Sequence, residues 1–485
     1  MCSYVQGEIL ALGPSRMPSS LWSSDDPNRQ RLVRTDAEEV AFGSRNRVVS
    51  GHEPSMPPRK NQGEAVAEAE VGEHALRALD GIRVCDLGGQ LAGAGATRYL
   101  AAFGAEVIRV EDPSTHGGWD IVRGAPPYVD DRRGIELGGG FNNHNVGKLG
   151  ATINLRTEKG KALLRSLIAV SDVVTENFSA GVFARMGFSY AELCRLRPDV
   201  IYVSNCGFGA TGPYSRYRTW GPIVQAVSGL TSTSALAGHE PAGWGYSYMD
   251  HMGANYMALA VLAAIVHRNR TGEGQWVDMS CSETAATLTG TDILDHDVNR
   301  RSRRLPDSVN SNRSEHPAMA PHGIYPSRGE DEWVAIACRN DSDWMALCRA
   351  ARLRPEVRDG FATLDARLGG QDELDAAVSE WTVKEDRFAV ARLLVDAGVP
   401  ASVVARPEDR IDNDQVTADW GLWPTVDHPD MGTVRVDGLP VHLSRTDWTI
   451  ERSAPRLGQH NDYVMGEVLG LSRSEIDGLV TEGVL

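Results

Sequence analysis

The chain has 485 residues, 41% of them hydrophobic and 24% charged, which is typical of a globular protein of two or more domains. Its formal net charge of −16 argues against general binding to nucleic acid or anionic membranes, because like charges repel. We find no apolar run of ~18 residues and no secretory signal, and we therefore expect a cytoplasmic protein.

Residues 1–79 differ from the rest of the chain. They hold six prolines, only three aromatic residues and mixed charge without an apolar period. Such a segment buries too little apolar surface to offset the entropy of ordering it. We expect a disordered or loosely ordered extension, and Met17 and Met56 are alternative start sites.

Short apolar strands alternate with helices from residue 80 onward. This pattern predicts a parallel sheet with helices on both faces, in which ligands bind beyond the carboxyl ends of the strands. The expected strands are 82–87, 107–111, 151–155, 172–176 and 200–205, and the expected helices are 94–103, 158–170 and 190–196.

A nearly all-apolar helix is expected at 255–270, and it should be buried on most sides. A strand at 275–280 follows it. We assign residues 80–296 to the first part of a large α/β domain.

The remainder divides into three parts. Residues 297–322 form a polar linker, residues 323–425 a smaller α+β domain, and residues 426–485 a return segment. Within them we expect a strand at 333–338 and helices at 341–351, 388–397 and 463–469.

The seven cysteines form no C-x-x-C pair, so reduced and mostly buried thiols are expected. The scattered histidines predict no metal site.

Three motifs have both a structural and a functional interpretation. In LAGAGATR, Gly93 and Gly95 suit either anion binding at a helix start or tight packing of the helix on the strand. These residues alone favour the two interpretations equally. Asn177 and Phe178 follow a strand and Arg185 lies nearby, which suits a phosphate site, although a capped turn is the commoner use.

Asp250 precedes the apolar helix, where an aspartate most often serves as its N-cap. The functional alternative is a partly desolvated carboxylate nucleophile. His251 should point away from it, because adjacent side chains diverge on a helix.

Taken in order, several segments of residues 80–485 resemble the family III CoA-transferases, a group to which alpha-methylacyl-CoA racemase is related. The segments are GIRVCDLGGQLAGAGATRYLAAFGAEVIRVE, VGKLGATINLRTEKGK, SDVVTENFSAGVFARMGF, RPDVIYVSNCGFGATGPY, VLAAIVHRNRTGEGQWVDMS and RLGQH.

The resemblance implies a doubly wound large domain built from both chain ends, a small domain and an interlocked dimer. It also implies Asp250 as the covalent nucleophile that transfers CoA from an acyl-CoA to a free acid. CoA is then the substrate, no cofactor is tightly bound, and CoA lies near Leu91, Asn177, Phe178 and Arg185. Arg185 would supply local positive charge in an acidic protein.

Departures from the family pattern narrow the function. The histidine of the racemase is missing where Trp220 and Gly221 stand, and Pro222 replaces an acidic residue common in transferases. MAPHGIYPSRG lacks the glycine-rich loop of formyl-CoA transferase. WGPIVQAVSGL and MAPHGIYP are more similar to transferases of larger, aromatic or dicarboxylic acids, such as the benzylsuccinate type.

Three alternatives remain beside the transferase. A racemase or isomerase of the same superfamily would need a second acid/base group opposite Asp250. A subunit of a hetero-oligomeric CoA-transferase is the next alternative, although the retained Asp250 argues against a non-catalytic one. A nicotinamide oxidoreductase is disfavoured, because the full phosphate-binding fingerprint is absent.

Overall fold

The computed structural model describes residues 76–234, 240–241, 243, 247–301 and 312–485. Residues 75–485 form one compact unit. Almost all of the expected extension at 1–79 lies outside the described residues, so that prediction is not tested.

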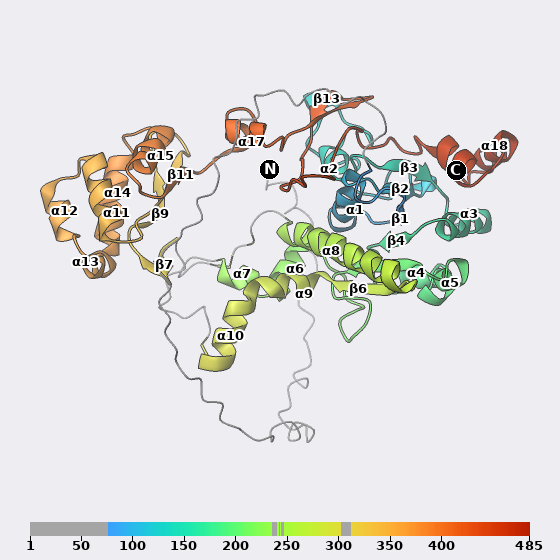
Figure 1. Ribbon diagram of the computed structural model, residues 1–485, viewed down its shortest axis with the longest axis horizontal. Helices are drawn as coiled ribbons and strands as arrows, with labels where there is room; N and C mark the ends of the chain where they lie inside the picture. The colour runs from blue at the N-terminus through green and yellow to red at the C-terminus, as the bar shows by residue number, and fades with distance from the viewer. Residues whose placement is uncertain (1–75, 235–239, 242, 244–246, 302–311) are drawn as a thin grey trace, which may run out of the picture. The chain divides into compact units, whose positions relative to one another are not determined.

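The centre of the unit is a six-stranded sheet in the order β3-β2-β1-β4-β5-β6, and every neighbouring pair in it is parallel (Figure 1). This confirms the predicted parallel sheet. The strands are β1 (Arg83–Asp86), β2 (Glu106–Glu111), β3 (Leu149–Thr152), β4 (Val173–Glu176), β5 (Ile201–Cys206) and β6 (Trp276–Ser280).

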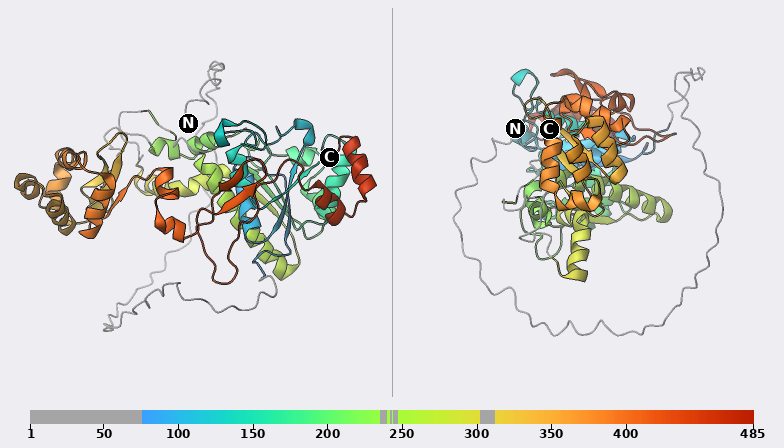
Figure 2. Two further views of the ribbon diagram at one scale, coloured as in Figure 1. Left: turned by 90° about the horizontal axis from the view of Figure 1, so that it is seen from above. Right: turned by 90° about the vertical axis from the view of Figure 1, so that its left-hand side faces the viewer.

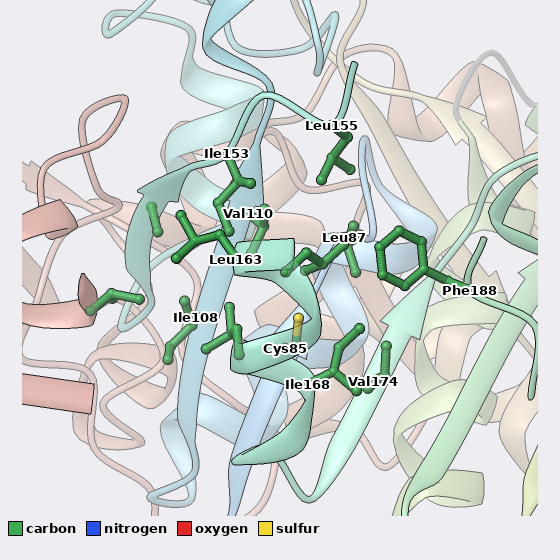
Figure 3. Close-up of a cluster of buried hydrophobic side chains, with 14 of the residues drawn as sticks. Cys85, Leu87, Ile108, Val110, Ile153, Leu155, Leu163, Ile168, Val174 and Phe188 are labelled. Carbon is green, nitrogen blue, oxygen red and sulfur yellow. The ribbon is translucent and has the colours of Figure 1, made fainter. Parts of the chain in front are cut away.

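The central strands are apolar on both faces, so their alternate residues enter two different cores. Val84 and Val173 pack with helices α1 (Ala92–Ala102) and α8 (Tyr248–Thr271) on one face. Cys85 and Val174 pack on the other face with α3 (Glu158–Ala169) and α5 (Tyr190–Leu196). Figure 3 shows side chains of this second core, drawn from the sheet and from α3, pointing toward one another. The prediction of helices on both faces is therefore confirmed.

The remaining helices before residue 302 are short. They are α2 (Gly139–His144), α4 (Val182–Arg185), α6 (Gly221–Val227), α7 (Leu230–Thr233), α9 (Cys281–Ala286) and α10 (Gly290–Asn299).

Helix α8 differs from its prediction in two ways. It begins at Tyr248 and not near Asn255, and one of its faces is open: Tyr256, Leu259, Leu262 and Val266 are 39–61% exposed. The other face is buried against α1 and the sheet. By length and composition alone α8 could cross a membrane, but a helix packed in a protein core has the same composition, so this is weak evidence.

A second, three-stranded antiparallel sheet lies in the later part of the chain, in the order β11-β10-β9. Its core contains Trp344, which is fully buried. The strands are β9 (His322–Pro326), β10 (Trp333–Ala337) and β11 (Ala401–Val403), and the helices are α11 (Asp341–Ala351), α12 (Pro355–Gly360), α13 (Leu364–Gly369), α14 (Gln371–Thr382), α15 (Arg387–Asp396), α16 (Pro407–Ile411) and α17 (Gln415–Asp419). The predicted elements at 333–338, 341–351 and 388–397 are thus confirmed to within a residue or two.

The domain boundaries remain predictions. Within the expected linker, β7 (Ser314–Glu315) and β8 (Ala318–Met319) form a short antiparallel pair.

The end of the chain packs against the first sheet. The Asn154 amide donates a backbone hydrogen bond of 2.8 Å to the Val484 carbonyl. Val464 and Met465 belong to the hydrophobic core around α3. Figure 1 and the left view of Figure 2 show α18 (Arg473–Thr481) in this part of the molecule, although α18 was not predicted. The expected helix at 463–469 is a π-helix, Tyr463–Val468. A two-stranded ribbon of β12 (Thr425–His428) and β13 (Gly432–Arg435) precedes it.

Among the described residues, five of the six cysteines are buried and all six are free thiols. This confirms the expected burial.

Candidate active site

The carboxyl ends of β1 and β4 lie side by side, because these strands are parallel neighbours in the sheet. Asn177 follows β4, and its side chain holds the loop that follows β1. The Oδ1 atom accepts a hydrogen bond from the Gly89 amide at 2.7 Å, and Nδ2 donates to the Gly89 carbonyl at 2.9 Å. The predicted site residue therefore holds both the N–H and the C=O of Gly89, which belong to two successive peptide units of this loop.

A buried ion pair holds the backbone amide of the next residue of this loop, Gln90. The Gln90 amide donates to Asp120 Oδ2 at 3.0 Å, and Arg109 Nη2 donates to the same oxygen at 2.8 Å. Both charged side chains are fully buried. Sequence reasoning missed Asp120, because it lies in an irregular segment far from the loop in the chain.

Gly93 and Gly95 are required for close packing. A Cβ at Gly93 would lie 2.7 Å from the Gly88 Cα, and a Cβ at Gly95 would lie 3.1 Å from the Ala254 Cβ. The packing interpretation of LAGAGATR is therefore confirmed, while the anion-binding interpretation is not tested. Leu91 stands immediately before α1 and is partly buried.

Phe178 packs edge-on against Trp119, with ring centroids 5.5 Å apart. Its backbone amide donates to Glu176 Oε2 at 2.7 Å. Burial raises the pKa of Glu176 to about 7, although hydrogen bonds from Tyr202 and from the Phe178 amide oppose the rise. Leu91, Asn177 and Phe178 thus lie at the carboxyl ends of two adjacent strands, as predicted from their positions.

Arg185 ends the short helix α4 and is exposed. Its Nη1 atom donates to the Ala180 carbonyl at 3.5 Å. Within the described ranges, Arg185 forms no hydrogen bond with Asn177 or Phe178. The structure therefore leaves its charge at the surface beyond β4.

Asp250 lies in the first turn of α8, three residues after Ser247. Ser247 occupies the N-cap position, so the interpretation of Asp250 as the N-cap is wrong. The S-x-x-D spacing, which is common at helix starts, was a signal for this arrangement. Met249 is completely buried beside Asp250 and fixes this turn in the core.

The Asp250 carboxylate lies against Gly221, the first residue of α6. A Cβ at Gly221 would be 2.9 Å from Asp250 Oδ2 and 3.1 Å from the Ser247 Cβ. Only glycine leaves this space open for the carboxylate. The sequence placed Gly221 where the racemase carries a histidine, but gave no reason to expect contact with Asp250.

Burial raises the pKa of Asp250 to about 6, and a hydrogen bond with Ser247 opposes part of the rise. The buried thiol of Cys281 is close enough for the Asp250 charge to help raise the pKa of Cys281 to about 12, after burial itself. Cys281 is therefore a neutral thiol, and it donates to Asn205 Oδ1 at 3.1 Å. A partly desolvated carboxylate of this kind suits nucleophilic attack.

The starts of α8 and α1 meet. A Cβ at Gly253 would lie 4.0 Å from the Ala92 Cβ, and Ala92 directly follows Leu91. The loop held by Asn177 and the carboxylate of Asp250 therefore lie at the same edge of the sheet. This proximity could not be seen in the sequence.

His251 points to a different neighbour from Asp250. Its ring centroid is 5.2 Å from that of His144. Burial lowers the pKa of both histidines, and that of His144 falls to about 4, so His144 is neutral at physiological pH. No three His, Cys, Asp or Glu side chains of the described residues gather as metal ligands.

Comparisons with known proteins agree with this geometry. Residues 79–461 match the model of CoA-transferase family III. The chain is 32% identical over 401 residues to the succinate–glutarate CoA-transferase of Agrobacterium fabrum, covering 82% of this chain and 97% of that protein. It is 31% identical to the succinyl-CoA–D-citramalate CoA-transferase of Chloroflexus aurantiacus, covering 84% and 98% of the two chains.

A solved structure gives the same result. The crystal structure of a CaiB/BaiF family protein from Brucella suis superimposes with a TM-score of 0.72 at 28% sequence identity. The alignment covers 81% of this chain and 99% of that one.

Proposed function

This chain belongs to CoA-transferase family III, and from that premise we propose that Asp250 is the covalent nucleophile with which it moves CoA from an acyl-CoA to a free carboxylic acid. The observation that carries the proposal is the position of the Asp250 carboxylate, in the first turn of α8 and against Gly221. Gly253, three residues after Asp250 on α8, lies close to Ala92 at the start of α1, where the loop after β1 ends.

The reaction needs no proton transfer and no external energy. An Asp250 oxygen attacks the thioester carbonyl, the C–S bond breaks, and CoA leaves as a thiolate from a mixed anhydride. The thiolate attacks the Asp250 carbonyl of that anhydride, which releases the donor acid and leaves an aspartyl-CoA thioester. The acceptor carboxylate then repeats the two steps in reverse and departs as the new acyl-CoA. Covalent catalysis thus divides one difficult exchange into easier steps.

The raised pKa of Asp250 suits this role. At a value of about 6, the carboxylate is largely ionised at neutral pH but more basic than an exposed aspartate. Among the described residues, no cation shifts its pKa and none forms an ion pair with it.

CoA would lie along the loop after β1, near Leu91, Asn177 and Phe178. The loop is preorganised, because Asn177 binds the N–H and C=O of Gly89 and Asp120 binds the N–H of Gln90. Preorganisation lowers the entropy that binding must overcome. Arg185 is exposed beyond β4 and would offer its charge to the phosphates, against a net charge of −16.

The acceptor that we propose is a dicarboxylic acid. Relatives that the chain matches over more than four fifths of its length are named for succinate, glutarate and citramalate. The racemase alternative is not favoured, because Trp220 and Gly221 stand about where the racemase has its histidine. Neither residue can act as the opposed acid or base that racemisation needs.

We also propose that two copies of the chain form an interlocked dimer. The exposed apolar face of α8, formed by Tyr256, Leu259, Leu262 and Val266, supports this proposal. Contiguous apolar surface of this kind marks an interaction site more often than a free surface.

Replacement of the nucleophile tests the mechanism. Asp250→Asn keeps the shape of the side chain but removes its nucleophilicity, so transfer from succinyl-CoA to glutarate should fall at least ~10³-fold, or ~4 kcal/mol of barrier. Hydroxylamine trapping during turnover should modify the peptide that contains Asp250 in the wild type only. Asp297→Asn, on the exposed surface of α10, is the matched control. If Asp250→Asn kept more than a tenth of the wild-type transfer rate, and no adduct were trapped on the wild-type peptide, the mechanism would be wrong.

A further inference from the structure

Gln225 carries a buried amide that nothing in the described part of the chain binds. The residue is 3% exposed, and its Nε2 atom has no hydrogen-bond partner there. A buried donor without a partner costs free energy, so such atoms are uncommon and call for an explanation. One explanation is a partner that is present only when substrate is bound.

Gln225 lies on the same buried face of α6 as Gly221, the residue beside the Asp250 carboxylate. The inward face of α6 contains Gly221, Val224 and Gln225, all buried, while Pro222 and Ile223 are exposed. Residues four apart on a helix are neighbours, and side chains lean toward the helix N-terminus. The Gln225 side chain therefore lies over the turn of Gly221.

Gly221 is the residue that touches the Asp250 carboxylate. The Oδ2 atom of Asp250 lies 2.9 Å from the place where a Cβ of Gly221 would stand. Cβ positions four residues apart on a helix are ~5–6 Å apart, and a glutamine amide reaches ~4 Å from its own Cβ. The amide can thus approach a small group bound at Asp250.

The other groups around α6 do not satisfy the amide. Val224 on the same face packs with Met249, Cys281 and Ala285, which are apolar or weakly polar. The Cys281 thiol donates its own hydrogen bond to Asn205. The Asp250 carboxylate forms no hydrogen bond with Gln225 in this structure, so the donor is left for a third group.

We propose that Gln225 is a further catalytic residue, whose side-chain amide donates a hydrogen bond to the carbonyl oxygen of the acyl group that Asp250 attacks. The inference rests on the proposed role of Asp250. As the new C–O bond forms, the carbonyl oxygen gains negative charge, and a neutral N–H donor stabilises it without losing its proton. The oxyanion then collapses, the C–S bond breaks, and the CoA thiolate leaves.

A neutral amide suits this place better than a charged group. A lysine or arginine beside Asp250 would stabilise its carboxylate and reduce its nucleophilicity. An oxyanion forms in both the donor and the acceptor half-reaction, so the same N–H donor can serve both.

The test is Gln225→Met, which keeps the length of the side chain and removes the donor. We expect kcat for transfer from succinyl-CoA to glutarate to fall on the order of 10²-fold, with KM for both substrates within about threefold. The melting temperature should stay equal or rise, because an unpartnered buried amide is replaced by an apolar group. Gln415→Met, at an exposed position of α17, is the matched control.

The outcomes separate this inference from the proposed function. If the Gln225 amide is merely structural, Gln225→Met should keep the wild-type kcat. That result would overturn the inference. The proposed function would still stand if Asp250→Asn were inactive. Loss of folding in Gln225→Met would also overturn it, by showing that the amide is structural. Full activity of Asp250→Asn, or a wild type inactive with every acyl-CoA and acid, would instead overturn the proposed function.

Discussion

The carboxylate of Asp250 fills the space beside Gly221 where any other residue would carry its Cβ: a Cβ at Gly221 would come within 2.9 Å of Asp250 Oδ2. Two segments of the chain thus meet at one pair of residues, the start of α6 and the first turn of α8. The contact fixes where the carboxylate can lie, since it is bounded on one side by Gly221 and on the other by its own helix.

Gly221→Ala should therefore reduce activity without reducing stability. The added methyl group displaces the carboxylate, and we expect kcat to fall at least ~10-fold, a barrier change of ~1.4 kcal/mol. The melting temperature should stay about equal, because the better helix propensity of alanine offsets the crowding of the new methyl group against Ser247. Gly290→Ala is the control, because no atom lies within 4 Å of the Cβ it would add at the start of α10. An unchanged kcat in Gly221→Ala would contradict the contact.

The pH dependence of the transfer rate should follow the ionisation of Asp250. Burial raises its pKa to about 6, and only the ionised form attacks, so kcat/KM should rise about tenfold per pH unit below 6 and level off above it. Glu176 has a raised pKa of about 7, also through burial, and Glu176→Gln distinguishes the two groups. The fall in kcat/KM below pH 6 should remain in Glu176→Gln. If the fall disappeared in that variant, it would be due to protonation of Glu176.

The same pKa predicts a stability change of defined sign. The folded-state pKa of Asp250 lies above the ordinary value of an aspartate, so the folded state binds the proton more tightly than the unfolded state. The stabilisation from protonation is present below about pH 4 and is lost as the pH rises to about 6. The melting temperature of Asp250→Asn minus that of the wild type should therefore increase from pH 4 to pH 7. A constant difference would contradict burial of the charge.

Asn177→Leu should weaken binding of acyl-CoA selectively. The variant removes both hydrogen bonds to Gly89 and frees the loop after β1. Ordering the loop again on binding costs entropy, and we expect KM for the acyl-CoA to rise ~10-fold, or ~1.4 kcal/mol, with little change for the acid. Asn269→Leu, at an exposed position near the end of α8, should change neither constant. Equal increases for both substrates would argue against a CoA site at this loop.

Leu259→Glu should break the proposed dimer. Leu259 is 61% exposed in the middle of the apolar face of α8, and a buried charge there would lack a partner in the interface. Light scattering should show a dimer in the wild type and a monomer or insoluble protein in the variant. Val480→Glu, on α18 and 55% exposed, is the control that should stay dimeric. A wild-type monomer that is folded and active would rule the dimer out.

Lys148→Met should destabilise the fold strongly. Lys148 and Asp86 form a fully buried ion pair, with Nζ 3.1 Å from Oδ2. Burial lowers the pKa of Lys148 to about 8, and the charge of Asp86 opposes this. Removing the lysine leaves a buried carboxylate unpaired, at a cost of ~3–5 kcal/mol in the free energy of unfolding by urea. Lys159→Met breaks the exposed pair with Glu482 and should cost less than ~1 kcal/mol.

The sequence by itself determined the architecture of the large sheet and the identity of its chemistry. Alternating apolar strands and helices predicted the parallel sheet, because a strand buried on both faces must be apolar throughout. The strands at β4 and β5 were placed within one residue of their positions in the structure. Asp250 was found from its position before an apolar helix and from the family resemblance.

Only the tertiary structure decided what surrounds that aspartate. Gly221 faces it, Asn177 holds Gly89 from a position 88 residues away, and Gln225 keeps a buried amide without a partner in the described residues. Local patterns fix the elements, since period and capping depend on neighbouring residues. The contacts between elements depend on how those elements pack, and a glycine is equally compatible with a turn, a helix start or a carboxylate until its neighbour is known.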